Sequence, residues 1–154
     1  MAIVYIEERT ILASAETVYD TVTDFARYPQ WNPWIVALVG EPVAGSELRA
    51  TVKTGDSYRT VQHRVLQAIR PAQTLQPGQF AWCDIGWFTV FAHGKRLRHI
   101  QELADGHCQY RCELRIEGPL VALVEWLYGK GMREGMTAEA NALQQDCQRR
   151  TKEP

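Results

Sequence analysis

The middle of the chain alternates between apolar and polar residues in short segments, and this pattern limits the possible folds more than any other feature. Residues two apart lie on the same face of a strand, so such alternation is typical of strands with one buried face. Closely spaced turn residues between the segments favour hairpins. From Ile35 to Gly118, the turn signals are Gly40, Gly45, Gly55-Asp56, Pro71, Pro77-Gly78, Gly86, Gly94 and Asp105-Gly106. The pattern predicts a meander of about six antiparallel strands.

A strand and a short helix are predicted ahead of the meander. Residues Ala2 to Leu12 are rich in Ile, Val and Tyr, which favour a strand. Ser14 is suited to cap a helix from Ala15 to Phe25, where Glu16 would favour the helix dipole. From Arg27 to Trp34, Pro residues disfavour helical geometry in the residues before them, so we expect a bent aromatic connector.

A long helix is predicted near the end of the chain. Gly118-Pro119 marks its start, because Pro is tolerated in the first turn, and no further Pro occurs from Leu120 to about Arg149. Gly129, Gly131 and Gly135 interrupt this segment, and each costs about 1 kcal/mol relative to Ala in a helix interior. We expect a bend or a close backbone approach at these glycines.

One face of the predicted sheet is apolar. The residues that share it come from three segments: Leu48, Ala50 and Val52; Val61, His63, Val65 and Ile69; and Tyr110, Cys112, Leu114 and Ile116.

Charged residues on the neighbouring strands are predicted to face solvent. Arginines alternate there with apolar residues and are accompanied by Glu102, Glu113 and Glu117, so cross-strand ion pairs on a solvated face explain them. These arginines are Arg96, Arg98, Arg111 and Arg115. Because acidic residues are interleaved, the pattern does not favour single-stranded nucleic acid.

Length and charge limit the partners. The 154 residues fit one domain, which we assign to residues 1–154. With 17 Lys and Arg against 18 Asp and Glu, the net charge of -1 gives no general attraction to nucleic acid. The segment from Met1 to Glu7 lacks the features of a signal peptide, and the apolar runs are too short to span a bilayer. We expect a cytoplasmic monomer or homodimer without integral membrane association.

The cysteines and short motifs predict neither a metal nor a cofactor. Cys83, Cys108, Cys112 and Cys147 lack CxxC spacing, so reduced and mostly buried thiols are expected. The sequence also lacks a Gly-rich phosphate loop, a GxSxG elbow and an HExxH helix.

Several local phrases are shared with one known family. They are Ala13 to Tyr19, Asp24 to Pro33 with its Trp-Asn-Pro sequence, Gly40 with Gly45, Ile116 to Leu120, and Ala140 to Leu143. In these phrases and in the order of elements, nearly the whole chain resembles the SRPBCC superfamily of START-like helix-grip proteins, especially its polyketide cyclase/dehydrase-like branch.

The resemblance implies an α+β fold: a six- to seven-stranded antiparallel sheet wrapped around a long C-terminal helix, with two short helices after the first strand. It also implies an internal cavity for a small hydrophobic molecule, since members bind lipids, polyketides, sterol-like molecules, plant hormones or quinones. It does not imply one reaction, because the branches differ in their catalytic residues.

Aromatic residues are the first ligand-binding candidates. Trp34 lies on the expected connector, where it can line a cavity entrance or anchor the core. The stretch broken by Gly86 and Gly94 fits either a mobile lid over a ligand or a strand pair with a buried loop. Its aromatic residues are Trp82, Trp87, Phe88 and Phe91.

Polar and thioether side chains complete the candidate site. His63 shares a strand face with apolar residues and can orient a ligand, transfer a proton, or serve as a structural residue. Tyr110 is a second acid-base candidate. Met132 and Met136 share a face of the long helix, where they can line a cavity or pack in the core.

Three functions remain open at this stage. The first is a noncatalytic carrier of a small hydrophobic molecule, and the second is a cyclase, dehydrase or aldol-type enzyme that uses His63 or Tyr110. A second titratable group within hydrogen-bond reach of the acid or base would favour the enzyme. The third is a protein-interaction module, which an exposed apolar rim would favour.

Overall fold

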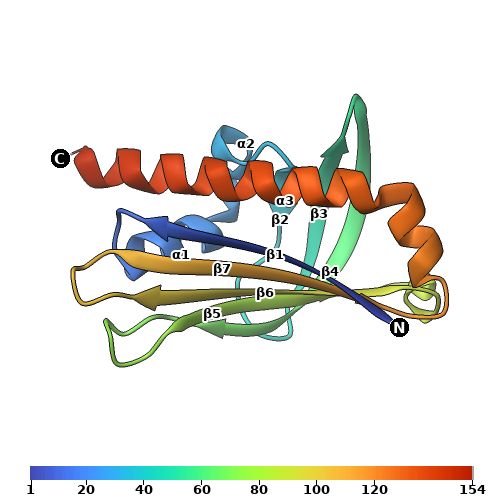
Figure 1. Cartoon of the computed structure of the whole chain (residues 1–154), viewed down its shortest axis with the longest axis horizontal. Helices are drawn as coiled ribbons and strands as arrows, with labels where there is room; N and C mark the ends of the chain where they lie inside the picture. The colour runs from blue at the N-terminus through green and yellow to red at the C-terminus, as the bar shows by residue number, and fades with distance from the viewer. Residues whose placement is uncertain (154) are drawn as a thin grey trace.

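The computed structural model describes residues 1–153 and contains a seven-stranded antiparallel sheet with a long helix lying across it (Figure 1). The strand order is β1-β7-β6-β5-β4-β3-β2. The predicted helix-grip α+β fold is therefore confirmed. The elements are β1 (Ala2–Ile11), α1 (Ala15–Thr23), the 3-10 helix η1 (Phe25–Arg27), α2 (Tyr28–Trp31), β2 (Ile35–Val39), β3 (Glu47–Thr54), β4 (Ser57–Ile69), β5 (Gly78–Asp84), the 3-10 helix η2 (Trp87–Val90), β6 (His93–Glu102), β7 (Cys108–Glu117) and α3 (Val121–Lys152).

Helix α3 is fastened to the edge strand β1 by side-chain hydrogen bonds. Arg9 donates from Nε and Nη2 to Asn141 Oδ1 at 3.1 and 2.9 Å. One turn further along, Gln144 Nε2 donates to the Thr10 carbonyl at 2.9 Å. These contacts hold the C-terminal half of α3 over the sheet, leaving its N-terminal half to close the opposite end.

The connector after α1 is more helical than the sequence predicted. Helix α1 ends at Thr23, and the chain then makes the short turns of η1 and α2 instead of a non-helical bend. Pro29 lies in the first turn of α2, where its missing N–H leaves no intrahelical bond unmade. The prediction of a non-helical connector did not allow for a helix that starts at a Pro.

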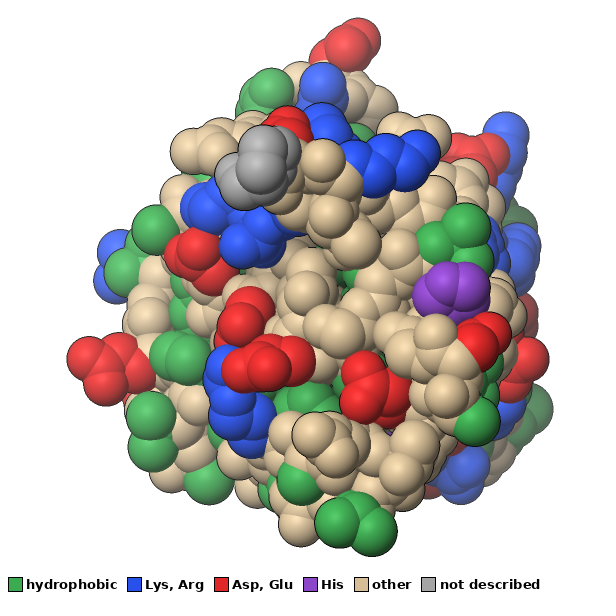
Figure 2. Space-filling model, turned by 90° about the vertical axis from the view of Figure 1, so that its left-hand side faces the viewer, with side chains coloured by type: hydrophobic (Ala, Val, Ile, Leu, Met, Phe, Trp, Pro, Cys, Tyr) green, Lys and Arg blue, Asp and Glu red, His purple; other side chains and the backbone are tan. Residues whose placement is uncertain are grey.

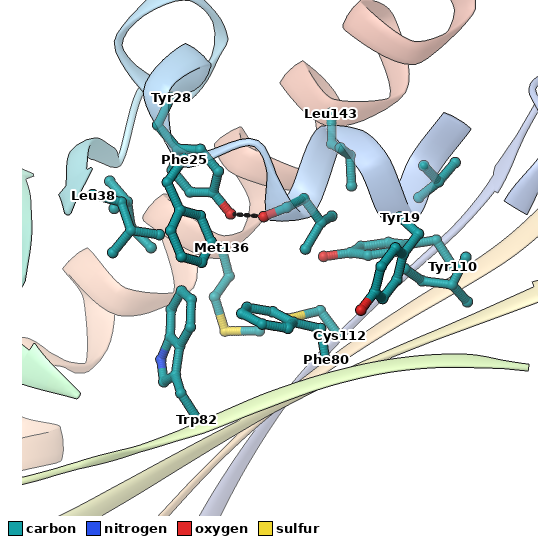
Figure 3. Packing of buried hydrophobic residues seen from close by; sticks show 14 of the residues in the cluster. Tyr19, Phe25, Tyr28, Leu38, Phe80, Trp82, Tyr110, Cys112, Met136 and Leu143 are labelled. Atoms are coloured by element: carbon teal, nitrogen blue, oxygen red, sulfur yellow. Dashed lines mark hydrogen bonds between the residues drawn. The ribbon is translucent and has the colours of Figure 1, made fainter. Parts of the chain in front are cut away.

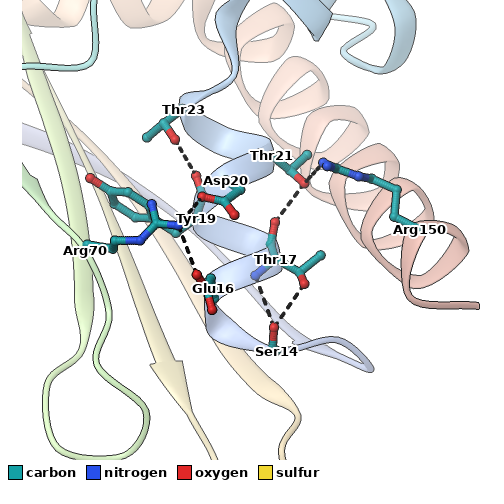
Figure 4. Close-up of polar contacts among 9 residues, drawn as sticks. All are labelled: Ser14, Glu16, Thr17, Tyr19, Asp20, Thr21, Thr23, Arg70 and Arg150. Atoms are coloured by element: carbon teal, nitrogen blue, oxygen red, sulfur yellow. Dashed lines mark hydrogen bonds and ion pairs between the residues drawn. The ribbon is translucent and has the colours of Figure 1, made fainter. Parts of the chain in front are cut away.

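Ser14 caps α1 as predicted (Figure 4). Its Oγ accepts a hydrogen bond from the Thr17 backbone N–H at 3.1 Å, satisfying a donor that the first turn leaves free. Replacing Ser14 with Ala is expected to lower the free energy of unfolding by about 1 kcal/mol. Urea denaturation would measure the change, with Ser57→Ala on an exposed strand end as the control. An unchanged midpoint for Ser14→Ala would contradict the capping role.

The core lies between the sheet and the helices, where aromatic residues pack edge to face (Figure 3). The Phe25 and Tyr28 rings meet at 5.8 Å between centroids and 89°, and Tyr28 is fully buried. Its hydroxyl donates to the Val22 carbonyl at 2.6 Å, which satisfies the buried polar atom. Both short helices are thereby joined to the same core as the sheet.

A β-bulge in β4 makes the predicted inner face wrong at Ile69. Between Val65 and Gln67 the register of β4 against β5 shifts by one residue, which reverses the alternation beyond that point. Ala68 consequently packs against the core, whereas Ile69, predicted to share the inner face with Val65, is 37% exposed.

The glycines of α3 coincide with the predicted bend and close approach. The first turns of the helix lie at a marked angle to the rest (Figure 1). At Gly135, a Cβ would lie only 2.5 Å from ring atoms of Trp34, so the ring packs directly on helix backbone. Within residues 1–153, no helix combines the length and the apolarity that a bilayer crossing requires.

Candidate functional site

A cavity of about 460 Å³ lies between the inner face of the sheet and the N-terminal half of α3. This size and a mainly apolar wall are typical of small-molecule sites. The residues that line it are Trp34, Ile35, Val52, Thr54, Arg59, Thr60, Val61, His63, Trp82, Asp84, Phe88, Ala92, Gly94, Arg96, Leu114, Ile116, Val124, Tyr128, Gly131 and Met132.

The rim beside the cavity is apolar and exposed. The η2 turn and the start of α3 are joined where the Leu120 backbone N–H donates to the Phe91 carbonyl at 3.0 Å. Trp87 on η2 and Trp126 on α3 are each 80% exposed. By contrast, the end of the molecule seen in Figure 2 shows acidic and basic side chains interspersed, with only scattered apolar ones. Exposed apolar surface is therefore prominent beside the cavity, a feature that would favour a protein-interaction module.

His63 and Asp84 form a polar pair on the cavity wall. They are directly opposite each other on β4 and β5, and His63 Nδ1 lies 3.0 Å from Asp84 Oδ1. That separation suits a hydrogen bond, but the direction of the contact leaves Nδ1 without a well-aligned partner, so the ring must turn slightly to donate. The imidazole stacks on the Trp82 ring at 5.0 Å and 16°.

A glycine makes room for the Asp84 carboxylate. The Gly94 backbone N–H donates to Asp84 Oδ2 at 3.0 Å, and a Cβ at Gly94 would lie 2.5 Å from that oxygen. Asp84 was missed in the sequence, although its spacing from Phe80 and Trp82 puts it on their inner face. The second titratable group that would favour an enzyme is thus present within reach of His63.

The prediction that four arginines face solvent is wrong for two of them. Arg96 and Arg98 point inward, are 3% and 0% exposed, and both contact Glu139 on α3. Their nearest nitrogens lie 2.9 and 3.1 Å from the same carboxylate atom, Glu139 Oε1. Arg111 and Arg115 do face outward. Arg111 makes the predicted kind of cross-strand pair, with Glu8 on β1, whereas Arg115 pairs with Glu117 on its own strand.

Aromatic faces surround the two buried guanidinium groups. The central carbon of Arg96 lies 5.0 Å from the Trp34 ring centroid, and that of Arg98 lies 4.3 Å from the Trp82 centroid. Weakly hydrated guanidinium groups favour such stacking. Burial by itself raises the pKa of Glu139, but the attraction of Arg96 and Arg98 and their hydrogen bonds outweigh it and lower that pKa.

The predicted site residues divide into two groups. Trp34, His63, Trp82 and Met132 line the cavity together. The others do not line it: Trp87 and Phe91 lie on the exposed side of η2, while Tyr110 and Met136 are buried in the core. Their ligand-binding roles remain predictions.

Tyr110 lies in the core, away from the cavity wall that holds His63. It is 1% exposed, and burial raises the pKa of its hydroxyl well above the usual 10.0. The hydroxyl therefore stays protonated at neutral pH, so it cannot act as a base there.

The Trp-Asn-Pro phrase positions the Trp34 wall. Asn32 is buried, and its Oδ1 accepts hydrogen bonds from the backbone N–H groups of Trp34 at 3.0 Å and Ile35 at 2.8 Å. This side-chain turn fixes where β2 begins. The Trp34 ring then packs between Gly135 and Arg96 and forms part of the cavity wall.

The fold and the cavity together define a ligand-binding helix-grip protein. A family model described as "Polyketide cyclase / dehydrase and lipid transport" matches residues 11–140. The chain belongs to this family. No curated protein matches the sequence.

Solved structures show the same fold at low sequence identity. The Zhui aromatase/cyclase from Streptomyces sp. R1128 is 15% identical with a TM-score of 0.79, and the match covers 99% of this chain and 97% of that one. A START superfamily protein from Mycobacterium smegmatis is 23% identical with a TM-score of 0.69, covering 95% and 97%. A norcoclaurine synthase mutant from Thalictrum flavum is 14% identical with a TM-score of 0.68, covering 98% and 97%.

Proposed function

We propose that this protein is an acid-base enzyme of the cyclase or dehydrase type, which binds a small, largely apolar carbonyl compound in its cavity. The observation that carries this proposal is the His63–Asp84 pair on an otherwise mainly apolar wall. A noncatalytic carrier needs only apolar surface and a polar group for orientation, whereas a carboxylate beside an imidazole also tunes a proton-transfer group. The proposal requires no metal and no cofactor.

The geometry supports different roles for the two residues: His63 transfers the proton, and Asp84 orients and stabilises the imidazole. Asp84 Oδ1 faces Nδ1 of the imidazole, and Gly94 holds the other carboxylate oxygen. Once the ring has turned so that Nδ1–H points at Asp84, Nε2 is the basic nitrogen available to a ligand. Nε2 can then remove a proton from carbon beside a carbonyl, and Asp84 stabilises the imidazolium that forms. Aldol ring closure onto a second carbonyl begins with such a step, and so does the loss of water from the β-hydroxy ketone that forms, in which the β-hydroxyl group leaves.

Native mass spectrometry of the freshly purified protein comes first. A copurified molecule, identified after solvent extraction, would give the chemical class of the ligand. We expect a largely apolar compound with at least one carbonyl or hydroxyl oxygen, since His63 and Asp84 are the polar groups opposite each other on the wall.

A proton-exchange experiment tests catalysis with a simple probe. The methyl protons of 2-acetonaphthone exchange with deuterated water after deprotonation beside the carbonyl, and NMR follows the loss of their signal. We expect the wild-type protein to accelerate exchange by about 100-fold or more, as positioned general bases do. His63→Ala should abolish the acceleration, and Asp84→Asn should lower it by about tenfold or more while the ketone still binds.

A surface pair provides the matched control. His107 Nδ1 lies 3.2 Å from Asp105 Oδ2 at the β6–β7 turn, and neither residue lines the cavity. His107→Ala should leave the exchange rate unchanged. If 2-acetonaphthone binds but wild-type protein does not accelerate exchange, the carrier function is favoured. If the ketone does not bind, the proposal fails for aromatic ketones altogether.

A further inference from the structure

The buried arginines carry more positive charge than their protein partner offsets. Arg96 and Arg98 share a single carboxylate, that of Glu139, so the three side chains sum to one positive charge. All three are 3% exposed or less. An uncompensated charge out of water costs several kcal/mol or more unless an anion or strong hydrogen bonds balance it.

The hydrogen bonds within the group are incomplete. Glu139 Oε2 and the Arg98 atoms Nε and Nη1 are buried without hydrogen-bond partners among the described residues. Arg96 Nε donates to Cys112 Sγ at 3.2 Å. Most buried polar atoms in proteins are satisfied, so these three atoms leave the polar contacts of the cluster incomplete.

Arg96 is the member that reaches the cavity. It lines the wall together with Trp34 and Trp82, whose rings stack against its guanidinium at 5.0 and 5.8 Å. Arg98 does not line the cavity, but its charge adds to the positive potential around Arg96. A planar guanidinium held between aromatic rings is a preorganised partner for a carboxylate or an enolate.

We propose that the ligand is an anion, whose acidic oxygen binds Arg96 inside the cavity while its apolar body packs on Trp34 and Trp82. This inference rests on the proposed function and narrows its substrate class to an apolar carbonyl compound that carries a carboxylate or a readily formed enolate. The ligand supplies the negative charge that the Arg96, Arg98 and Glu139 cluster lacks.

A matched pair of probes tests the charge requirement. Naphthalene-2-carboxylate and 2-acetonaphthone have nearly the same shape, but only the first is an anion at pH 7. Isothermal titration should show that the carboxylate binds about tenfold to a hundredfold more tightly. Equal affinities would overturn the inference while leaving the proposed function intact. If neither probe binds, the inference fails, and the proposed function fails for aromatic ketones as well.

Two arginine variants test the position of the anion. Arg96→Met should remove the preference for the carboxylate and leave 2-acetonaphthone affinity within about threefold, since methionine keeps an apolar stem of similar length. Arg59 also lines the cavity but is exposed and stacks on Tyr128. Arg59→Met should keep the preference. A loss of preference in Arg59→Met instead would place the anion elsewhere and overturn the inference.

A measurement on the wild-type protein removes any dependence on the variants' folding. Carbon-13 NMR of carboxyl-labelled naphthalene-2-carboxylate reports whether the bound acid is ionised. Contact with Arg96 should hold the pKa of the bound carboxyl below that of the free acid, whereas burial in a neutral apolar pocket would raise it. A raised pKa would contradict the inference directly.

Discussion

Replacing Glu139 with Gln is expected to lower the free energy of unfolding by about 3–5 kcal/mol, the usual cost of removing one partner from a buried ion pair. Glu139 is 1% exposed and is the carboxylate that contacts both Arg96 and Arg98. Without its charge, two buried guanidinium groups face each other with no anion between them. Urea denaturation monitored by tryptophan fluorescence would measure the loss.

An exposed glutamate on the same helix is the control for that variant. Glu134 contacts Lys130 at 3.7 Å, and its side chain is 67% exposed. Exposed pairs of this kind contribute about 0.3–0.5 kcal/mol, so Glu134→Gln should change stability little. A similar small effect for Glu139→Gln would mean that the cluster is not balanced by this carboxylate.

The pH dependence of stability gives an independent test of Glu139. Because its pKa in the folded state is lowered from the usual 4.5, the folded protein binds fewer protons there than the unfolded chain. Its contribution is therefore fully present above about pH 4.5 and is lost as the pH falls through the lower folded value. The stability difference between wild type and Glu139→Gln should shrink on acidification. A constant difference would contradict the lowered pKa.

Replacing Gly135 with Ala is expected to destabilise the protein, although Ala is the better helix former. The added Cβ would lie 2.5 Å from three ring atoms of Trp34. Forcing an extra methyl into such a contact costs about 1–3 kcal/mol, more than the gain of about 1 kcal/mol in helix propensity. Because Trp34 also lines the cavity, the same variant should weaken 2-acetonaphthone binding. Thermal denaturation and titration calorimetry measure the two effects.

Gly131 supplies the matched comparison on the same helix. A Cβ there would meet only Thr54 Cγ2, at 3.4 Å, which is a tolerable contact. Gly131→Ala should therefore stabilise the protein by up to about 1 kcal/mol. Two Gly→Ala changes four residues apart should thus have opposite signs. If both variants were more stable than wild type, the close contact between Gly135 and the Trp34 ring would be contradicted.

Much of the fold could be predicted from local patterns, because period-two alternation, turn residues and helix caps act over a few residues. The strand and helix boundaries at Ser14 and after Gly118-Pro119 are examples. Ser14 caps α1 as predicted, whereas Pro119, predicted in the first turn of the long helix, lies just before Leu120, the N-cap of α3. Ile69 could not be predicted, because the bulge after Val65 depends on how β4 pairs with β5. Alternation gives a face only as long as the register is unbroken.

The candidate site was predicted in part. Trp34, His63, Trp82 and Met132 were identified from residue type and spacing, and they do meet at one cavity. Asp84 was missed because a carboxylate at a strand end is usually assigned to solvent. Arg96 and Arg98 were predicted on the wrong face of β6. Alternation groups them with Gly94 and Ile100 but does not say which of the two faces is buried.

The sequence by itself determined the antiparallel meander, the long closing helix and an apolar inner face, because these follow from short-range periodicity and capping. Only the tertiary structure decided that Glu139, more than 40 residues from Arg98, enters the core beside two arginines. Burying a charge depends on a partner brought by another element, and no local pattern contains that information. Which polar groups line the cavity was likewise decided by the tertiary structure.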